Sequence, residues 1–321
     1  IYQCDWSSDV CSSDLYTSLT GSVLDTLIRN RVETVLVTPR GRFRARLLVD
    51  EHKHVQRRRA QYLQLSRPDV AARLARTIVR GKLRNSARFL ALRGSQYGDE
   101  ALRTASARIR ALGAMVEHAD DLDVLRGIEG QGGALYFRAF PRLIRAEGFA
   151  FDGRSRRPPL DPVNALLSFV YTLLTLEVLN GVKIAGLDPY LGSLHDIEYG
   201  RPSLACDLVE EWRAFLGDRL VLSLINRQVI HPEDFIHRAT DSTDGVDEED
   251  LKRKRPVEMK PKTARAFIQA YEAWMVTPVP LPGKNQKTDH RGLIRFQVRR
   301  LLDYLMGETE SYEPYLWSES K

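Results

Sequence analysis

Hydrophobic and polar residues follow two different spacings along this chain. Near the start, VETVLVT (32–38) and RFRARLLV (42–49) are rich in β-branched and apolar residues and flank a turn at residues 39–41, which predicts a β-hairpin. Just before them, Val23, Leu24, Leu27 and Ile28 mark a short amphipathic helix that Thr20 can cap. From residue 53 onward, apolar residues recur with helical spacing. We therefore expect an α+β chain, with a small N-terminal β region (16–52) followed by a large, mainly α-helical domain (53–321).

The most apolar segment spans residues 163–179. Asp161 can cap a helix there, and Pro162 suits its first turn. Five polar residues interrupt the segment and no basic flank is evident: Asn164, Ser168, Thr172, Thr175 and Glu177. These features predict a buried central helix rather than a membrane span. Two later helices are expected at residues 263–275 and 292–306.

Composition describes a globular protein with a sizeable core: 321 residues, 43% hydrophobic, 28% charged and a net charge of +6. The first fifteen residues lack an initiator Met and the features of a signal peptide. Their run DWSSDVCSSDL resembles a translated sequencing adapter, so we interpret residues 1–15 as an artefact that replaces the native N-terminus. Setting aside Cys4 and Cys11 leaves Cys206 without a disulfide partner, which fits a reducing cytoplasm.

Positive charge is concentrated between residues 53 and 110, where fifteen Lys and Arg face three acidic residues. Helical spacing sets an apolar stripe, Leu74, Ile78, Val79 and Leu83, among basic residues. The basic residues of this helix are Arg73, Arg76, Arg80, Lys82, Arg84 and Arg88. They could neutralise the phosphates of DNA without reading its bases. An arginine-rich face that is merely solvated stays an open alternative.

Acidic residues follow a histidine between residues 186 and 218. His195 is expected in a loop, and Ser203 can cap a helix that begins just after Pro202. On that helix Asp207, Glu210 and Glu211 share one arc, opposite an apolar face. Two interpretations are open. The carboxylates could form a solvated surface paired with arginines such as Arg213, or they could join His195 in a Mg²⁺ or Mn²⁺ site. A second metal site in HPEDFIH (231–237) is not favoured, because its spacing fits a short capped helix beginning at Pro232.

Four sequence blocks occur in a distinctive order: GIEGQGGALYF (127–137), DPVNALLSFVYTLL (161–174), GLDPYLGSLH (186–195) and GRPSLACDLVEEWR (200–213). Together they resemble the Cas1 family of CRISPR-associated proteins, the integrases of CRISPR adaptation. The similarity extends from about Leu19 to near the C-terminus. It implies that residues 16–52 are the remnant of an N-terminal β domain that forms the family's dimer interface, and that residues 53–321 form the catalytic domain.

The resemblance also implies site residues. Glu129, His195 and Glu210 correspond to the family's ligands for Mg²⁺ or Mn²⁺, although the family often has Asp at the last position. Asp207 corresponds to an acidic residue that shapes the site. Tyr190 could orient a DNA strand, or it could be a buried aromatic with a bonded hydroxyl. Because His195 must be neutral to bind a metal, activity should fall at acid pH.

The implied function is insertion of new spacer DNA into a CRISPR array. In the family's transesterification, the terminal hydroxyl of a short DNA duplex attacks a phosphodiester at the edge of a repeat. The implied partners are double-stranded DNA, a second copy of the chain and the bridging protein Cas2, in a prokaryotic cytoplasm. Two alternatives stay open: a metal-dependent nuclease acting on branched or single-stranded DNA, and a non-catalytic DNA-binding scaffold.

Overall fold

The computed structural model describes residues 19–30, 34–37, 43–47, 54–119, 121–156, 158–237 and 257–317. In these residues the fold is mainly helical, with three short two-stranded sheets, which confirms the predicted α+β class. The expected turn at residues 39–41 and the interpreted artefact lie outside the described residues. So does the boundary between residues 52 and 53, and the division into domains therefore stays a prediction.

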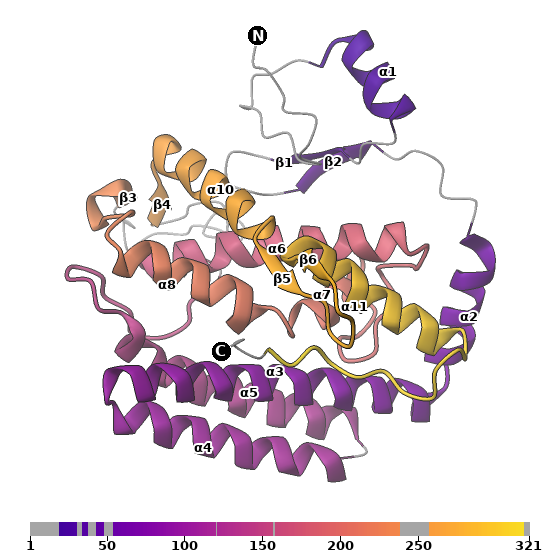
Figure 1. Ribbon diagram of the computed structural model, residues 1–321, viewed down its shortest axis with the longest axis horizontal. Coiled ribbons are helices and arrows are strands. Elements are labelled where there is room, and N and C mark those ends of the chain that lie inside the picture. Colours follow the sequence, from indigo (N-terminus) through magenta and orange to yellow (C-terminus); the bar gives the residue numbers. More distant parts are fainter. Residues whose placement is uncertain are drawn as a thin grey trace, which may run out of the picture.

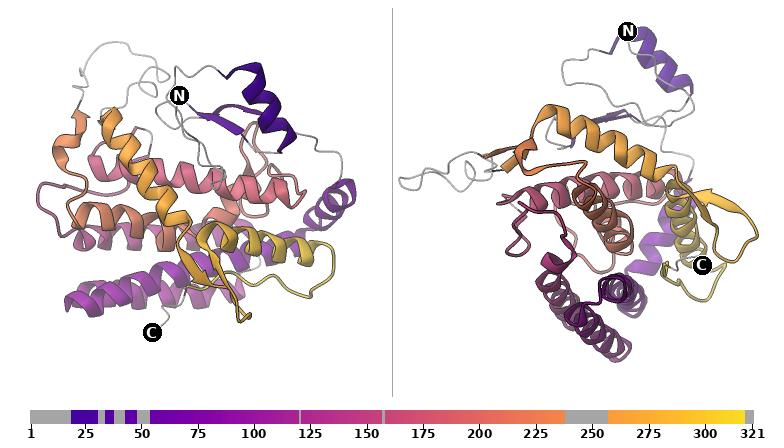
Figure 2. Two further views of the ribbon diagram at one scale, coloured as in Figure 1. Left: turned by 45° about the horizontal axis from the view of Figure 1, so that its top comes forward. Right: turned by 60° about the vertical axis from the view of Figure 1, so that its left-hand side comes forward.

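The N-terminal elements match the sequence pattern. Helix α1 (Gly21–Arg29) begins after Thr20, whose hydroxyl accepts a hydrogen bond from the backbone N–H of Val23. Strands β1 (Thr34–Val37) and β2 (Phe43–Leu47) pair antiparallel as a hairpin, with Thr34 opposite Leu47. No residue of α1 is buried, and α1 stands apart from the helical body in Figure 1 and in the right-hand view of Figure 2.

One layer of the helical body consists of three long helices that lie side by side at the bottom of Figure 1. They are α3 (Pro68–Tyr97), α4 (Glu100–Met115) and α5 (Leu122–Ala139), and the shorter α2 (Val55–Leu65) precedes them. The chain reverses between α3 and α4 at Gly98, which has a φ of 66°. Asp99 then caps α4 by accepting from the backbone N–H of Leu102. The apolar stripe of α3 predicted from Leu74, Ile78, Val79 and Leu83 is buried, as expected.

The second layer is built around α6 (Pro162–Ile184). Asp161 accepts a hydrogen bond from the backbone N–H of Asn164 at 2.7 Å, and Pro162 occupies the first turn, as predicted. Among the described residues, α6 is the one helix long and apolar enough to cross a membrane, but 61% of its most apolar window is buried inside the protein. It packs against α7, α8 and α11, which confirms its interpretation as a buried central helix.

The remaining elements surround α6. The helices are α7 (Ser203–Val209), the π-helical segment η4 (Arg213–Asp218), α8 (Arg219–Asn226), α10 (Pro261–Met275) and α11 (His290–Leu305). Short 3₁₀ turns cover Val116–His118, Phe140–Leu143 and Pro232–Asp234. The strands are β3 (Phe235–His237), β4 (Val257–Met259), β5 (Pro278–Pro280) and β6 (Lys287–Asp289). The two helices predicted near the C-terminus are therefore present, each beginning two residues early.

Two local predictions were wrong. Ser203 does not cap α7; it is the first helical residue, and its hydroxyl donates to the backbone carbonyl of Asp196 at 2.8 Å. The helix also does not continue through Glu211, because α7 ends at Val209 and the chain turns before η4. In HPEDFIH, the expected helix is a single 3₁₀ turn in which Asp234 accepts from the backbone N–H of His231, and strand β3 follows.

Helices α3 and α5 approach closely at Gly132. A methyl group at this position would lie 2.2 Å from the buried Leu83 Cδ2, so glycine is required by the packing. The neighbouring glycines of α5, Gly130 and Gly133, have open space beside them. The close approach brings Lys82 of α3 opposite Glu129 of α5.

We predict that Gly132→Ala lowers the free energy of unfolding by about 1–3 kcal/mol, because Leu83 must move in a packed core. Gly127→Ala, in an open position of the same helix, should raise it by up to about 1 kcal/mol. Urea unfolding of both variants checks this. Equal stabilities for the two variants would contradict the tight contact between α3 and α5.

Candidate active site

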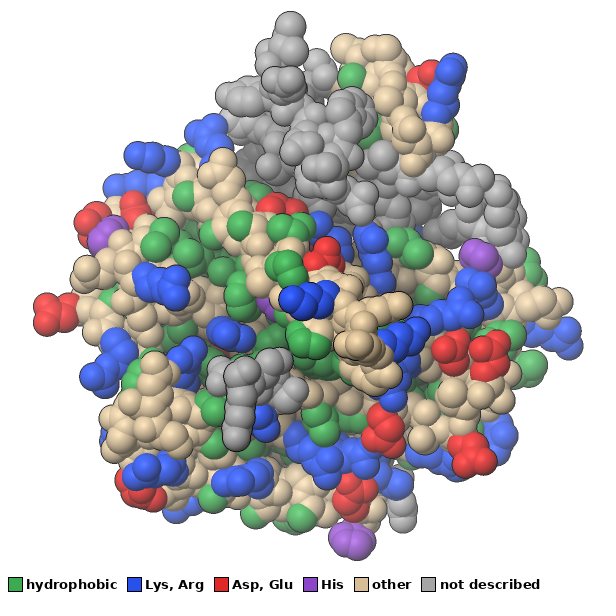
Figure 3. Space-filling model, viewed as in Figure 1, with side chains coloured by type: hydrophobic (Ala, Val, Ile, Leu, Met, Phe, Trp, Pro, Cys, Tyr) green, Lys and Arg blue, Asp and Glu red, His purple; other side chains and the backbone are tan. Residues whose placement is uncertain are grey.

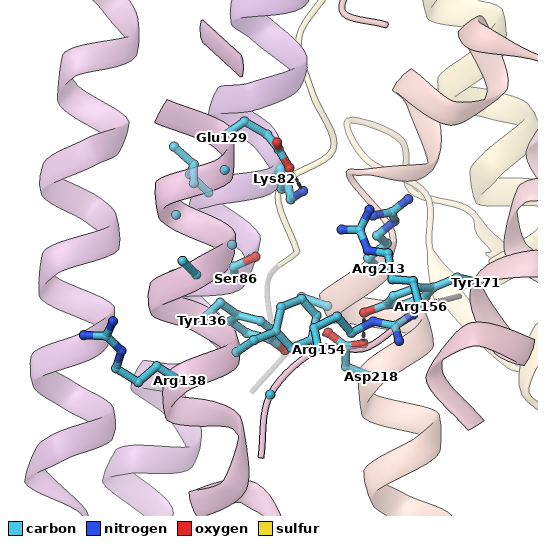
Figure 4. A pocket seen from close by; sticks show the side chains of 18 of the residues that line it. Lys82, Ser86, Glu129, Tyr136, Arg138, Arg154, Arg156, Tyr171, Arg213 and Asp218 are labelled. Atoms are coloured by element: carbon cyan, nitrogen blue, oxygen red, sulfur yellow. Dashed lines mark hydrogen bonds and ion pairs between the residues drawn. The ribbon is translucent and has the colours of Figure 1, made fainter. Parts of the chain in front are cut away.

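A cavity of about 670 Å³ opens between the two layers, bounded by α3, α5, the loop at residues 151–156 and η4. Lys82 and Glu129 lie together at one end of it, and Tyr136 and Asp218 lie at the other (Figure 4). Four guanidinium groups belong to its lining: Arg138, Arg154, Arg156 and Arg213. The cavity is thus rich in positive charge and has one pair of oppositely charged groups at its end.

The carboxylates of Glu129 and Glu210 share one ammonium group. Lys82 of α3 forms an ion pair with Glu129 of α5, and its Nζ lies 2.7 Å from Oε2 of Glu210 at the end of α7. The other oxygen of Glu210 lies 3.0 Å from Nη1 of Arg213. Burial alone would raise the pKa of Glu210, but Arg213 and Lys82, with a smaller effect of His195, lower it to about 2. Glu210 is therefore ionised although it is only 4% exposed.

Asp207 organises the loop that carries His195. Its fully buried carboxylate accepts hydrogen bonds from the backbone N–H groups of Ser193, Leu194 and His195 at 2.6, 3.0 and 3.0 Å. Its Oδ1 also lies 2.6 Å from Nδ1 of the His195 ring. Because an ionised carboxylate only accepts, Nδ1 carries the proton, and in the neutral imidazole Nε2 keeps a free lone pair. A side chain at Gly192 would meet Asp207 at 2.5 Å, which explains the glycine before this loop.

Of the two interpretations of the carboxylates between residues 207 and 211, the solvated surface is wrong. Asp207, Glu210 and Glu211 are all buried, because the chain turns after Val209 and sends the two adjacent glutamates to different partners. Glu211 accepts from the hydroxyl of Tyr312 at 2.6 Å and from the backbone N–H of Tyr315 at 2.9 Å. Burial raises the pKa of Glu211 to about 7. Glu211 thus anchors the C-terminal segment, whereas Glu210 faces Glu129.

The donor groups at this site have the chemistry of a divalent-cation site. Two carboxylates and one imidazole nitrogen suit Mg²⁺ or Mn²⁺. Oε2 of Glu210 is buried and makes no aligned hydrogen bond, since its contact with Lys82 is an ion pair only. Within the described residues, however, no three His, Cys, Asp or Glu side chains stand close enough to enclose an ion. Lys82 supplies the positive charge between Glu129 and Glu210.

The six basic residues predicted to bind DNA do not form one surface. Arg73, Arg84 and Arg88 are exposed on α3. The guanidinium groups of Arg76 and Arg80 bind the backbone carbonyl of Ala119 and the carboxylates of Glu117 and Glu313, respectively. Lys82 lies on the opposite side of the helix from Arg73, at the candidate site. Acidic side chains are interspersed with Lys and Arg over the face seen in Figure 3.

Two further sequence interpretations concern Tyr190 and Cys206. The side chain of Tyr190 is 49% exposed, so it is not the buried aromatic that was one of the alternatives. Its backbone N–H donates to the carboxylate of Asp188 at 2.8 Å. Cys206 is a free, half-buried thiol whose pKa is raised by burial, which suits a packing residue better than a nucleophile.

Sequence reasoning missed the group that forms the far end of the cavity. The hydroxyls of Tyr136 and Tyr171 donate to the two oxygens of Asp218 at 2.7 and 2.6 Å. The guanidinium groups of Arg154 and Arg213 lie 5.4 and 4.9 Å from the centre of the Tyr171 ring (Figure 4). These residues come from α5, α6, η4 and a loop, so no local spacing in the sequence could have indicated that they meet.

Comparison with known proteins identifies the family. The family model described as CRISPR associated protein Cas1 matches residues 10–273. A curated relative, the CRISPR-associated endonuclease Cas1 1 of Chlorobaculum tepidum, is 37% identical over 292 residues, which are 89% of this chain and 81% of the relative. This chain belongs to the Cas1 family.

Solved structures show the fold of this Cas1 chain in other contexts. A casposase bound to integration product superimposes with a TM-score of 0.77 at 22% identity, covering 92% of this chain and 77% of the casposase chain. A Cas6-RT-Cas1–Cas2 complex gives a TM-score of 0.74 at 21% identity, covering 94% of this chain and 31% of that chain. At these identities the likeness concerns the fold alone. The family membership confirms the resemblance that the four sequence blocks indicated.

We predict that Asp218 makes the stability of this Cas1 chain depend on pH. Burial, partly offset by the hydroxyls of Tyr171 and Tyr136, raises the pKa of Asp218 from 3.8 to about 6. The folded state therefore binds this proton more tightly than the unfolded state does, which stabilises the protein fully below about pH 4. This stabilisation is lost as the pH rises through about 6. Relative to Asp218→Asn, wild-type stability should fall on the order of 3 kcal/mol between pH 4 and pH 7.

Urea unfolding of both proteins across this range is the measurement. Glu211 titrates in both proteins, so its effect cancels in the difference. A difference that does not change with pH would show that Asp218 titrates normally in the folded protein.

Proposed function

We propose that this chain is a divalent-cation-dependent DNA integrase, which inserts spacer DNA into a CRISPR array by transesterification. The observation that carries the proposal is the arrangement of Glu129, Glu210 and His195. The two carboxylates are held against one ammonium group, and the imidazole, fixed by Asp207, is near enough to affect the pKa of Glu210. Membership of the Cas1 family, and the similarity to a relative that is a CRISPR-associated endonuclease, support a reaction at a DNA phosphodiester.

Each residue has a separate role in this proposal. Glu129, Glu210 and Nε2 of His195 would bind the cation, and Asp207 would keep the imidazole in the tautomer that can bind it. A bound Mg²⁺ or Mn²⁺ would supply Lewis-acid stabilisation of charge on the scissile phosphate and the leaving oxygen. No protein nucleophile is needed, because the attacking hydroxyl belongs to DNA. Arg213, paired with Glu210 and packed on Tyr171, would help to fix the site.

The cavity offers a place for a DNA strand next to these ligands. Glu129 and Lys82 line one end, and the exposed guanidinium group of Arg156 lines its course (Figure 4). The guanidinium group of Arg154 also lines the cavity but already donates to Asn164 and Ser168. Guanidinium groups bind phosphate oxygens without distinguishing bases. Arg73, Arg84, Arg88 and Tyr190 are exposed, and we assign them to an outer DNA-binding surface. Arg76 and Arg80, whose guanidinium groups already bind other parts of the chain, are less suited to this role.

The proposal includes partners. Two structural neighbours, a casposase bound to integration product and a Cas6-RT-Cas1–Cas2 complex, support an integration reaction and an assembly with Cas2. We therefore propose double-stranded DNA, a second copy of the chain and Cas2 as partners of this protein.

Strand transfer tests the function. A short DNA duplex is incubated with supercoiled plasmid, Cas2 and either Mn²⁺ or Mg²⁺. We predict joined products with the wild type, a decrease of about 100-fold or more with Glu210→Gln, and none after chelation of the metal. Glu147→Gln, which changes an exposed glutamate outside the cavity, should retain full activity. Thermal unfolding of each variant establishes that it is folded.

The other outcomes separate the alternatives. Plasmid that is cut without joining would favour a nuclease. Binding of DNA that is equally strong in wild type and Glu210→Gln, with neither cutting nor joining, would favour a non-catalytic scaffold. Joining that survives in Glu210→Gln would contradict the assignment of this residue.

A further inference from the structure

We propose that Lys82 is an exchangeable counter-ion of the candidate site. In the absence of a divalent cation its ammonium group holds Glu129 and Glu210 together, and when a cation binds it moves into the cavity to contact a DNA phosphate. This inference rests on the proposed function, since it requires that the two glutamates bind the cation.

The geometry gives Lys82 a different environment from the other basic residues of α3. Its side chain is 13% exposed and reaches two carboxylates that come from separate elements, α5 and the end of α7. Arg73, Arg84 and Arg88 are exposed. Lys82 also lines the cavity, in contact with Glu129 at its end (Figure 4). The ammonium therefore lies between the metal-ligand candidates and the space proposed for DNA.

Charge balance requires the exchange. The carboxylates of Glu129, Glu210 and Asp207 face the positive charges of Lys82 and Arg213, so the site with a neutral His195 carries one negative charge as it stands. A divalent cation added to this arrangement would leave one uncompensated positive charge in a largely buried place, which is costly. Departure of one positive group relieves this cost. Binding of the cation and release of a positive group are therefore coupled.

Lys82, and not Arg213, is the group that can leave. The guanidinium of Arg213 lies 3.0 Å from Glu210 and 4.9 Å from the centre of the Tyr171 ring, and it is held on both sides. Lysine has a flexible four-carbon side chain with a compact charge. Lys82 can swing from the carboxylates into the cavity without movement of α3. There Arg156 already provides positive charge for a phosphate.

The consequence is cooperative binding of cation and DNA. A phosphate in the cavity stabilises the released position of Lys82, which frees the carboxylates for the cation. By linkage, the cation strengthens DNA binding by the same factor. Without DNA, Lys82 competes with the cation and keeps its affinity low.

Isothermal titration with Mn²⁺ tests the inference, with Lys82→Met as the main variant. Methionine keeps the length of the side chain and removes the charge. We expect Lys82→Met to bind Mn²⁺ at least about tenfold more tightly than wild type when DNA is absent, a ratio that corresponds to about 1.4 kcal/mol. A short duplex should increase the Mn²⁺ affinity of wild type and change that of Lys82→Met much less. Lys262→Met, which removes an exposed charge from α10 outside the cavity, should bind Mn²⁺ as wild type does without DNA.

Lys82→Arg keeps the tests independent of how well the methionine variant folds. A planar guanidinium can bind both carboxylates at once and is harder to displace, so Mn²⁺ affinity should decrease severalfold. Mn²⁺ affinities in Lys82→Met or Lys82→Arg that equal the wild-type value would overturn the inference.

Glu210→Gln separates this inference from the proposed function. If Mn²⁺ binding depends on Glu210 but not on residue 82, the counter-ion role is wrong and the metal site stands. If Mn²⁺ binding by wild type is unaffected by Glu210→Gln, the metal site itself is wrong, and the counter-ion role falls with it.

Discussion

Two carboxylates that are largely withdrawn from water stay ionised next to each other only if positive charge is placed between them. In this protein the requirement is met by Lys82, which binds both Glu129 and Glu210, and by Arg213. These four residues come from α3, α5, the turn after α7, and η4, so the ion pairs join the two layers of the helical body. The close approach of α3 and α5 at Gly132 accompanies this arrangement, and a methyl group at this position would lie 2.2 Å from Leu83 Cδ2 of α3.

A second set of contacts fixes the backbone next to Glu210. Glu211 turns away from the site and accepts from Tyr312 and the backbone of Tyr315. Asn85 of α3 donates to the backbone carbonyls of Glu211 and Tyr315 and accepts from the backbone N–H of Trp317. The C-terminal segment, which runs beside α3 in Figure 1, therefore fixes the turn between α7 and η4. The two adjacent glutamates thus have different roles: Glu210 belongs to the candidate site, and Glu211 belongs to the surrounding structure that supports it.

Periodicity and capping residues predicted much of the fold. The buried helix at α6, its cap at Asp161, the hairpin β1–β2 and the stripe on α3 all follow from local patterns that tertiary packing reinforces. The ordered sequence blocks indicated the Cas1 family. The failures occurred where distant residues decide the outcome. The turn after Val209 depends on contacts with Asn85 and the C-terminal segment, and the partner of Glu129 and Glu210 is a lysine 47 positions before Glu129. Neither contact has a local signal in the sequence.

We have proposed that Glu129, His195 and Glu210 form one cation site, from which Lys82 must withdraw. A crystal structure with Mn²⁺, in which anomalous scattering locates the ion, tests this proposal. We expect one strong anomalous peak about 2.0–2.2 Å from carboxylate oxygens of Glu129 and Glu210 and from Nε2 of His195, with Lys82 turned into the cavity. A peak at other residues, or a Mn²⁺ ion bound while Lys82 still joins the two glutamates, would contradict it.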